Sequence, residues 1–187
     1  MDRNDGRSNR NGGVNLWPLA GVAAVGLLTA AVAQPAITHY FAWKEPAYTF
    51  PLRDVRLQIR ADRYGSGRFG ARRSGGRKHK GVDFAAPVGT PVLAAKSGWA
   101  WIGQRNDGMG NHVLIKHPDG TTTRYGHLDT TEIADGQWIW QGTPVGTVGK
   151  SGNAKAKAIR AHLHFEVLTK RGLAVNPLPQ MDINRDD

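Results

Sequence analysis

The sequence contains no cysteine among its 187 residues. This absence excludes a disulfide framework, a zinc site with thiolate ligands and a catalytic cysteine. Any metal site must therefore use histidine, aspartate or glutamate, and neutral imidazole and carboxylate are good zinc ligands.

Acidic residues are also scarce. Fifteen Asp and Glu face 25 Lys and Arg, so the net charge is +10 and the sequence pI is about 10.3. Such an excess suggests an anionic partner, which could be nucleic acid, a phospholipid surface or an acidic polymer. It says little about the fold.

Charge is missing altogether from Leu16 to Ala33. This run just reaches the length of about 20 mostly apolar residues that a membrane-spanning helix needs. We expect residues 14–36 to be a transmembrane signal-anchor, with a disordered basic tail, residues 1–13, in the cytoplasm. The alternative is a signal peptide cleaved near Ala33, because Ala31-Val32-Ala33 fits a small-x-small site. Both readings place the remainder beyond the inner membrane, in the periplasm, and argue against a nucleic-acid partner.

The rest of the chain favours short strands, because its 24 glycines and 10 prolines are typical of turns. Residues 37–60 read as a linker followed by a first strand, in which apolar and polar residues alternate from Val55 to Arg60. The pattern is β from Pro91 to Leu128, and strand alternation there places Tyr125 and His127 on one face. Residues 179–187 read as a polar tail outside the core.

The stretch from Arg160 to Val167 contains the most informative pair of residues. His162 and His164 are two apart, so in a strand both imidazoles point to one face while Leu163 and Phe165 point into a core. Imidazole binds zinc and moves protons near neutral pH. Two imidazoles on one strand face can divide those roles.

A second motif, His79-Lys80-Gly81-Val82-Asp83, follows a loop rich in glycine and arginine. A histidine and an aspartate four residues apart converge if the chain turns between them, and both are zinc ligands. The preceding loop, residues 61–78, includes Arg72 and Arg73. Its place before the motif suggests the rim of a binding groove.

Three motifs in this order, His-x-Gly-Val-Asp, Tyr-x-His-Leu and His-Leu-His-Phe-Glu, resemble those of the lysostaphin-type (LytM-domain) zinc endopeptidases. The resemblance covers residues 61–178, which would form the zinc endopeptidase domain. It implies an all-β fold of the duplicated-hybrid-motif type, with two antiparallel sheets forming an open groove, here preceded by the N-terminal hydrophobic helix. It also implies hydrolysis of peptide cross-links in bacterial peptidoglycan.

By this resemblance one zinc ion is held by His79, Asp83 and His164, and the catalytic histidines are His127 and His162. Three protein ligands leave a fourth position free, as catalytic zinc requires. Either histidine could be the general base, and we assign that role to His162 because it shares a strand face with a ligand. His127 would position the water or stabilise the oxyanion. The remaining site predictions are Glu166 and His117 as supports of the ligands, and Arg72, Arg73 and Tyr125 as substrate-binding residues.

The sequence departs from many family members between Ser151 and Ala161, where the loop is longer and basic, and no tyrosine shortly precedes His79. The alternative function is a non-catalytic module on the same fold that binds peptidoglycan or regulates an amidase. The complete set of three metal ligands favours the enzyme.

Overall fold

The computed structural model describes residues 36, 40–41 and 44–182, which belong to one compact unit, Ala36–Asp187. The predicted tail, residues 1–13, and nearly all of the predicted membrane segment, residues 14–36, lie outside the described residues. Within the described part of the chain, no helix has the length and apolar character needed to cross a membrane.

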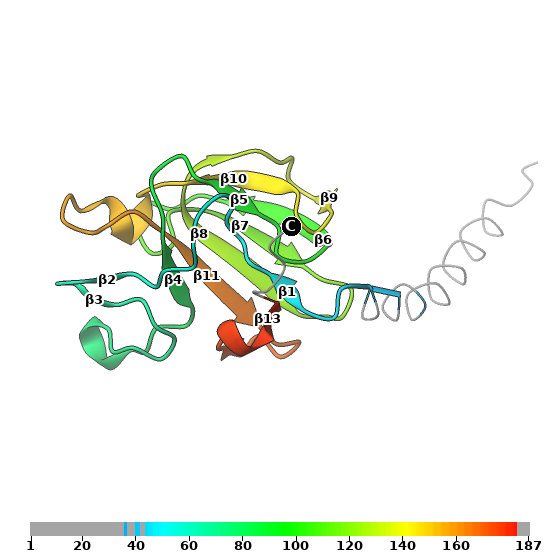
Figure 1. Ribbon diagram of the computed structural model, residues 1–187, viewed down its shortest axis with the longest axis horizontal. Coiled ribbons are helices and arrows are strands. Elements are labelled where there is room, and N and C mark those ends of the chain that lie inside the picture. Colours follow the sequence, from blue (N-terminus) through cyan, green and yellow to red (C-terminus); the bar gives the residue numbers. More distant parts are fainter. Residues whose placement is uncertain (1–35, 37–39, 42–43, 183–187) are drawn as a thin grey trace, which may run out of the picture. The chain divides into compact units, whose positions relative to one another are not determined.

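The fold is built around one branched, nine-stranded antiparallel sheet (Figure 1). Its main path runs β12-β11-β8-β7-β6-β9, while β4 pairs with β11, and β10 pairs with both β8 and β5. The strands are β4 (Val82–Ala85), β5 (Pro91–Leu93), β6 (Gly98–Gly103), β7 (Asn111–Lys116), β8 (Thr122–Thr131), β9 (Gln137–Ile139), β10 (Pro144–Val148), β11 (His162–Leu168) and β12 (Ala174–Val175).

Two small ribbons and three short 3-10 turns complete the described unit. The ribbons pair β1 (Tyr48–Thr49) with β13 (Met181–Asp182) in parallel, and β2 (Ala61–Asp62) with β3 (Gly65–Ser66) in antiparallel. The turns are η1 (Ser74–Gly76), η2 (Gly152–Lys155) and η3 (Leu178–Gln180). The predicted all-β class is confirmed, but a branched main sheet stands in place of two separate antiparallel sheets. The branch arises because β8 is long enough to pair with β11 along its first half and with β10 along its second.

The core lies on one face of the sheet and follows the alternation of the strands. Leu163 and Phe165 of β11 are fully buried there, as predicted, together with Val113 and Ile115 of β7. Burial of each such side chain contributes roughly 1.5–3 kcal/mol. The other face of β11 carries His162, His164 and Glu166, which are also buried. The strand is therefore covered on both sides, by an apolar core and by a polar site.

Strand β8 changes its phase at His127, whose φ of 63° is left-handed. Tyr125 pairs with Val113, and Leu128 pairs with Asn111. Between these two pairs β8 has two residues where β7 has one, so β8 contains one extra residue. Such a bulge turns the following side chains over. The prediction that Tyr125 and His127 share a face is therefore wrong. Tyr125 is fully buried in the core, where its hydroxyl accepts a hydrogen bond from the Ala95 N–H at 2.8 Å.

The ends of the domain also differ from expectation. Tyr48 and Leu52 belong to the core, so the predicted linker 37–60 is packed against the sheet over much of its described length. The predicted strand from Val55 to Arg60 is reduced to a single bridge between Ile59 and Phe84.

The expected alternation of buried apolar and exposed polar side chains fails in this segment. Arg60 is buried, where it forms an ion pair with Asp83, while Leu57 is 39% exposed. At the other end, Met181 packs into the core and pairs with β1, so residues 179–182 are not a free tail. Residues 183–187 lie outside the described residues.

Candidate metal centre

Three predicted ligands meet at one point on the polar face of the sheet. Asp83 on β4 and His164 on β11 are directly opposite each other in the paired strands, and the His164 Nδ1–Asp83 Oδ1 distance is 2.8 Å. His79 lies just before β4, with its Nε2 2.9 Å from His164 Nδ1 and 3.0 Å from Asp83 Oδ1. The ligand atoms of the three residues lie within 4.8 Å of one another.

The glycine of the His-Lys-Gly-Val-Asp motif has a steric reason. A Cβ atom at Gly81 would overlap the carbonyl oxygen of Phe165. Glycine therefore allows the chain to pass close to β11 as it carries His79 and Asp83 to the site.

Hydrogen bonds from the far side of each ring fix which nitrogen faces the site. His79 Nδ1 donates to the Arg68 carbonyl at 3.0 Å, and His164 Nε2 donates to Glu166 Oε1 at 3.1 Å. His79 Nε2 and His164 Nδ1 are thus left to face Asp83, an arrangement typical of metal-binding histidines. Burial would lower the pKa of His164, but its hydrogen bonds to Asp83 and Glu166 raise it to about 9. The same two carboxylates would attract a metal cation.

Asp83 is held by two arginines. Its Oδ2 accepts hydrogen bonds from Arg60 at 3.0 and 3.3 Å and from Arg73 at 3.1 Å, while Oδ1 faces the histidines. Burial opposes ionisation, but hydrogen bonds from His164 and His79 hold the pKa of Asp83 well below its usual range. Arg73, which was predicted to bind substrate, donates to the predicted metal ligand Asp83, and its role toward substrate stays a prediction. Arg72 is exposed, which leaves its predicted role open to test.

Two more imidazoles lie beside the three ligands. His162 Nδ1 donates to the Arg160 carbonyl at 2.7 Å, and His127 Nδ1 donates to the Ser151 carbonyl at 2.9 Å. The two ring centroids are 4.9 Å apart, and His162 Nε2 lies 3.9 Å from Asp83 Oδ1. Burial lowers the pKa of His162 and lowers that of His127 to about 3. Both rings are therefore neutral at neutral pH, with Nε2 able to accept a proton.

Of the predicted supporting residues, the structure brings one to the site and not the other. Glu166 bonds to His164 and also accepts from Arg124 at 3.3 Å. His117 lies in a separate buried network, where Nδ1 donates to the Ser97 carbonyl at 2.9 Å and Nε2 accepts from the Thr123 hydroxyl at 3.0 Å. It has no contact with the ligands, so its support of the metal site is not borne out. Tyr125 likewise lines the core rather than a groove.

Arg60 is the principal residue that the sequence did not reveal. It sits in a segment read as a strand, 23 residues before Asp83, and nothing local marks it as different from Arg56. The carbonyls of Arg68, Ser151 and Arg160 were also missed, because a backbone acceptor has no signature in the residue type.

The family model described as "Peptidase family M23" matches residues 77–177, which is more than half of the chain. The chain belongs to peptidase family M23. The match contains both paired strands of the site, the three predicted ligands His79, Asp83 and His164, and the two further imidazoles His127 and His162. The predicted family resemblance is confirmed.

Similar sequences and structures agree with this membership. The M23 chain is 37% identical over 115 residues to the DD-carboxypeptidase/endopeptidase Mpg of Neisseria meningitidis, covering 59% of this chain and 25% of that protein. It is 37% identical over 108 residues to the peptidoglycan DD-endopeptidase ShyC of Vibrio cholerae, covering 56% and 24%. The chain thus spans about a quarter of the length of these curated relatives.

Two solved structures are similar over most of the chain. A zinc-containing peptidase from Vibrio cholerae has a TM-score of 0.57 at 29% identity, covering 70% of this chain and 39% of that one. The catalytic domain of the prophage-encoded M23 protein EnpA from Enterococcus faecalis has a TM-score of 0.51 at 31% identity, covering 65% and 95%. The M23 fold of the described unit is therefore shared with known peptidases.

Proposed function

We propose that this chain is a zinc-dependent endopeptidase that hydrolyses peptide cross-links of bacterial peptidoglycan. The proposal rests above all on the convergence of His79, Asp83 and His164 beside two neutral imidazoles. Membership of family M23 and the name of the relative ShyC support peptidoglycan as the substrate.

The donor set fits one zinc ion. Two imidazole nitrogens and one carboxylate oxygen converge within the reach of a single ion, and the other ring nitrogens and Oδ2 of Asp83 are already hydrogen-bonded away from it. Three ligands of these types are what catalytic zinc sites use. When bound, the zinc would polarise the scissile carbonyl and make a nearby water acidic enough to react near neutral pH.

The two remaining histidines would move protons. The His162 Nδ1 proton is committed to the Arg160 carbonyl, so Nε2 is the atom that can take a proton from water and later return it to the leaving amine. His162 Nε2 is also close to Asp83, at 3.9 Å from Oδ1. His127 is fixed in the same tautomer by Ser151, so its Nε2 would accept a hydrogen bond from the water and orient it.

Arg60 and Arg73 would position Asp83 rather than touch the substrate. Both bind Oδ2, which leaves Oδ1 as the oxygen that faces the histidines. Arg60 is further held by Asp62 at 2.6 Å, so the arginine that orients the ligand is itself fixed.

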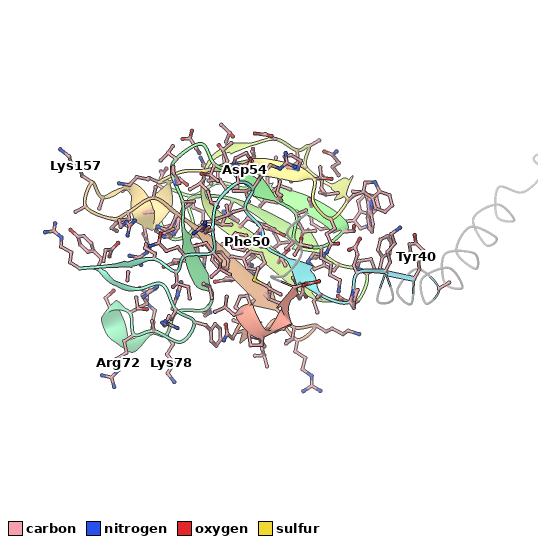
Figure 2. The ribbon with its side chains drawn as sticks, in the orientation of Figure 1. Tyr40, Phe50, Asp54, Arg72, Lys78 and Lys157 are labelled. Carbon is pink, nitrogen blue, oxygen red and sulfur yellow. The ribbon has the colours of Figure 1, made fainter. Side chains whose placement is uncertain are left out.

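The surface around the site suits an anionic wall polymer. Figure 2 shows Arg72, Lys78 and Lys157 extending outward from the loops at the end of the unit where β11 begins. Long-range attraction of this kind raises the rate of encounter with an anionic partner. For the whole chain we propose an inner-membrane anchor through residues 14–36 with the catalytic domain in the periplasm. Cleavage near Ala33 would release the same domain there.

The test is digestion of purified peptidoglycan by the full-length chain in detergent, with mass spectrometry of the released fragments. We expect new amino termini at the cross-links, complete loss of product on chelation, recovery with zinc, and no product with His164→Ala. His112→Ala, at a half-buried histidine of β7 whose Nδ1 bonds to the Gly110 carbonyl, is the matched histidine control and should retain activity.

Product formed under chelation, or by His164→Ala, contradicts the proposal. Stoichiometric zinc binding without new amino termini would instead support the non-catalytic module.

A further inference from the structure

Five aromatic side chains gather at one edge of the main sheet, away from the metal centre. We call Tyr40, Phe41, Trp99, Trp138 and Trp140 the aromatic patch. Their ring centroids form a continuous chain of contacts: Tyr40–Phe41 at 5.2 Å, Phe41–Trp138 at 5.4 Å, Trp138–Trp140 at 5.7 Å and Trp99–Trp138 at 5.6 Å. Geometries of this kind are attractive beyond simple burial.

Three side chains of the aromatic patch are largely exposed, whereas Phe41 is buried among them. Trp99 is 51% exposed, Trp140 58% and Tyr40 48%. Trp99 pairs with Trp138 across β6 and β9, and its neighbour Ala100 is buried in the core, so Trp99 faces away from the core. Contiguous exposed apolar surface on a folded domain marks a place where something binds.

The position of the aromatic patch in the chain suggests the partner. Tyr40 follows the end of the uncharged run at Ala33 by seven residues, which can span at most about 25 Å. If residues 14–36 cross a membrane, the patch is therefore within short reach of the bilayer surface. Figure 2 places Tyr40 at the opposite end of the described unit from Arg72, Lys78 and Lys157.

The chemistry of the patch matches a lipid headgroup layer. Indole and phenol rings are enriched at membrane–water interfaces, because one part of the ring is apolar and the other can hydrogen-bond. Lys44 lies 5.7 Å from the Tyr40 ring and Lys116 lies 5.1 Å from the ring of Trp101, which is two residues from Trp99 on β6. These cations would complement anionic headgroups.

We propose that the aromatic patch rests in the headgroup layer of the membrane in which the chain is anchored, and so fixes which side of the domain faces the bilayer. The inference depends on the proposed anchor. Strands β6 and β11 are three strand spacings apart, about 14 Å. The metal centre at the start of β11 would then be held above the membrane with its basic loops directed outward.

The absence of cysteine makes a direct test possible, since one introduced cysteine carries one spin label. Labels at Val25→Cys, Trp140→Cys and Leu173→Cys are placed in the full chain, reconstituted in vesicles of phosphatidylglycerol and phosphatidylethanolamine. We expect the label at 25 to be accessible to oxygen but not to a water-soluble nickel complex, and the label at 140 to have less access to nickel in the vesicles than in detergent. The label at 173, on an exposed leucine, should keep it.

The outcomes separate the two proposals. A label at 140 that behaves like the one at 173, while the label at 25 lies in lipid, overturns the patch but leaves the anchor intact. A label at 25 that stays in water overturns the anchor and the patch with it. Immobilisation of the label at 140 by soluble glycan fragments, and not by vesicles, would make the patch a carbohydrate site and also overturn the inference.

A second measurement distinguishes contact between the aromatic patch and lipid from proximity that the anchor alone would cause. A label at the exposed Lys116, which pairs with Trp99 across β7 and β6, should show the same loss of nickel access, and the double change Trp99→Ser/Trp140→Ser should restore access. The matched double change Tyr64→Ser/Leu173→Ser, at two exposed positions outside the patch, should leave it unchanged. Equal nickel access in both double variants would show that the patch makes no lipid contact.

Discussion

His164 and His117 are buried to nearly the same extent, with 8% and 5% of their surface exposed, yet their pKa values move in opposite directions. Burial lowers the pKa of His117 to about 4, because its partners are a neutral carbonyl and a neutral hydroxyl. Burial acts on His164 too, but the carboxylates of Asp83 and Glu166 outweigh it and raise the pKa to about 9. The charge of the partners, rather than depth in the fold, separates the histidine of the proposed metal site from the structural one.

The largest expected effect comes from removing the charge at the centre of the metal site. Asp83→Ala should abolish zinc binding and lower the free energy of unfolding by up to about 3–5 kcal/mol, because it removes the buried carboxylate that Arg60 and Arg73 share and leaves Arg60 with Asp62 alone. Urea unfolding and zinc titration measure the two effects. Asp107→Ala removes a carboxylate paired with Arg105 at the surface, and should change neither. If Asp83→Ala has the free energy of unfolding of the wild type, the contacts of Arg60 and Arg73 with Asp83 contribute nothing to stability.

The pH dependence of stability tests the lowered pKa of His117. Because the folded pKa of His117 lies below its unfolded value, the unfolded chain binds a proton that the folded chain does not between about pH 6.5 and 4. The free energy of unfolding should fall as the pH is lowered through this window, by about 3 kcal/mol in total from this residue. Urea unfolding of His117→Gln in chelator should lack that component. Identical pH profiles for the two proteins would refute it.

A smaller effect is expected from changing the charge behind a ligand. Glu166→Gln keeps an acceptor for His164 Nε2 but removes its negative charge, so zinc affinity should fall about 10–100-fold with the fold intact. Thr123→Val is the counterpart at His117. It should lower stability by about 1–3 kcal/mol and leave zinc affinity unchanged, since it strips a buried nitrogen of its donor. A Thr123 variant with weakened zinc binding would mean that the two networks are coupled.

The smallest effect on the site is expected at Tyr125. Tyr125→Phe removes a buried hydroxyl that bonds to Ala95 and Thr123, and should cost about 1–3 kcal/mol of stability because the Ala95 N–H loses its acceptor. The KM for peptidoglycan fragments should not change, because the side chain is fully buried. A raised KM with unchanged stability would restore the substrate-binding role that the structure argues against.

The parts of the site that lie along one strand were predictable from sequence. Strand alternation correctly placed His162 and His164 on one face and Leu163 and Phe165 in the core. The pairing of Asp83 with His164, 81 residues apart, could be expected only from the family resemblance, since no local pattern specifies which strands are neighbours. Arg60 was missed for the same reason, because its partner Asp83 lies on β4 and no local pattern links the two residues.

Two of the failed predictions share a cause, in that each applied a regular period where the backbone departs from it. At His127 the bulge reverses the alternation, so Tyr125 was assigned to the wrong face. At Arg60 an ion pair outweighs the preference of an arginine for solvent, and the expected strand does not form. Residues 179–182 were predicted to be a polar tail, but Met181 packs into the core and pairs with Tyr48 of β1.

The left-handed backbone of His127 has a consequence for anyone who engineers this protein. A β-carbon in that conformation is unfavourable by about 1 kcal/mol or more, a strain that glycine escapes and asparagine tolerates well. If His127 has the proposed catalytic role, its replacement by glycine or asparagine should therefore yield a catalytically impaired molecule that withstands heat better than its parent. Selection for thermal stability alone would favour variants that have lost His127, so a screen for stable variants must measure turnover as well.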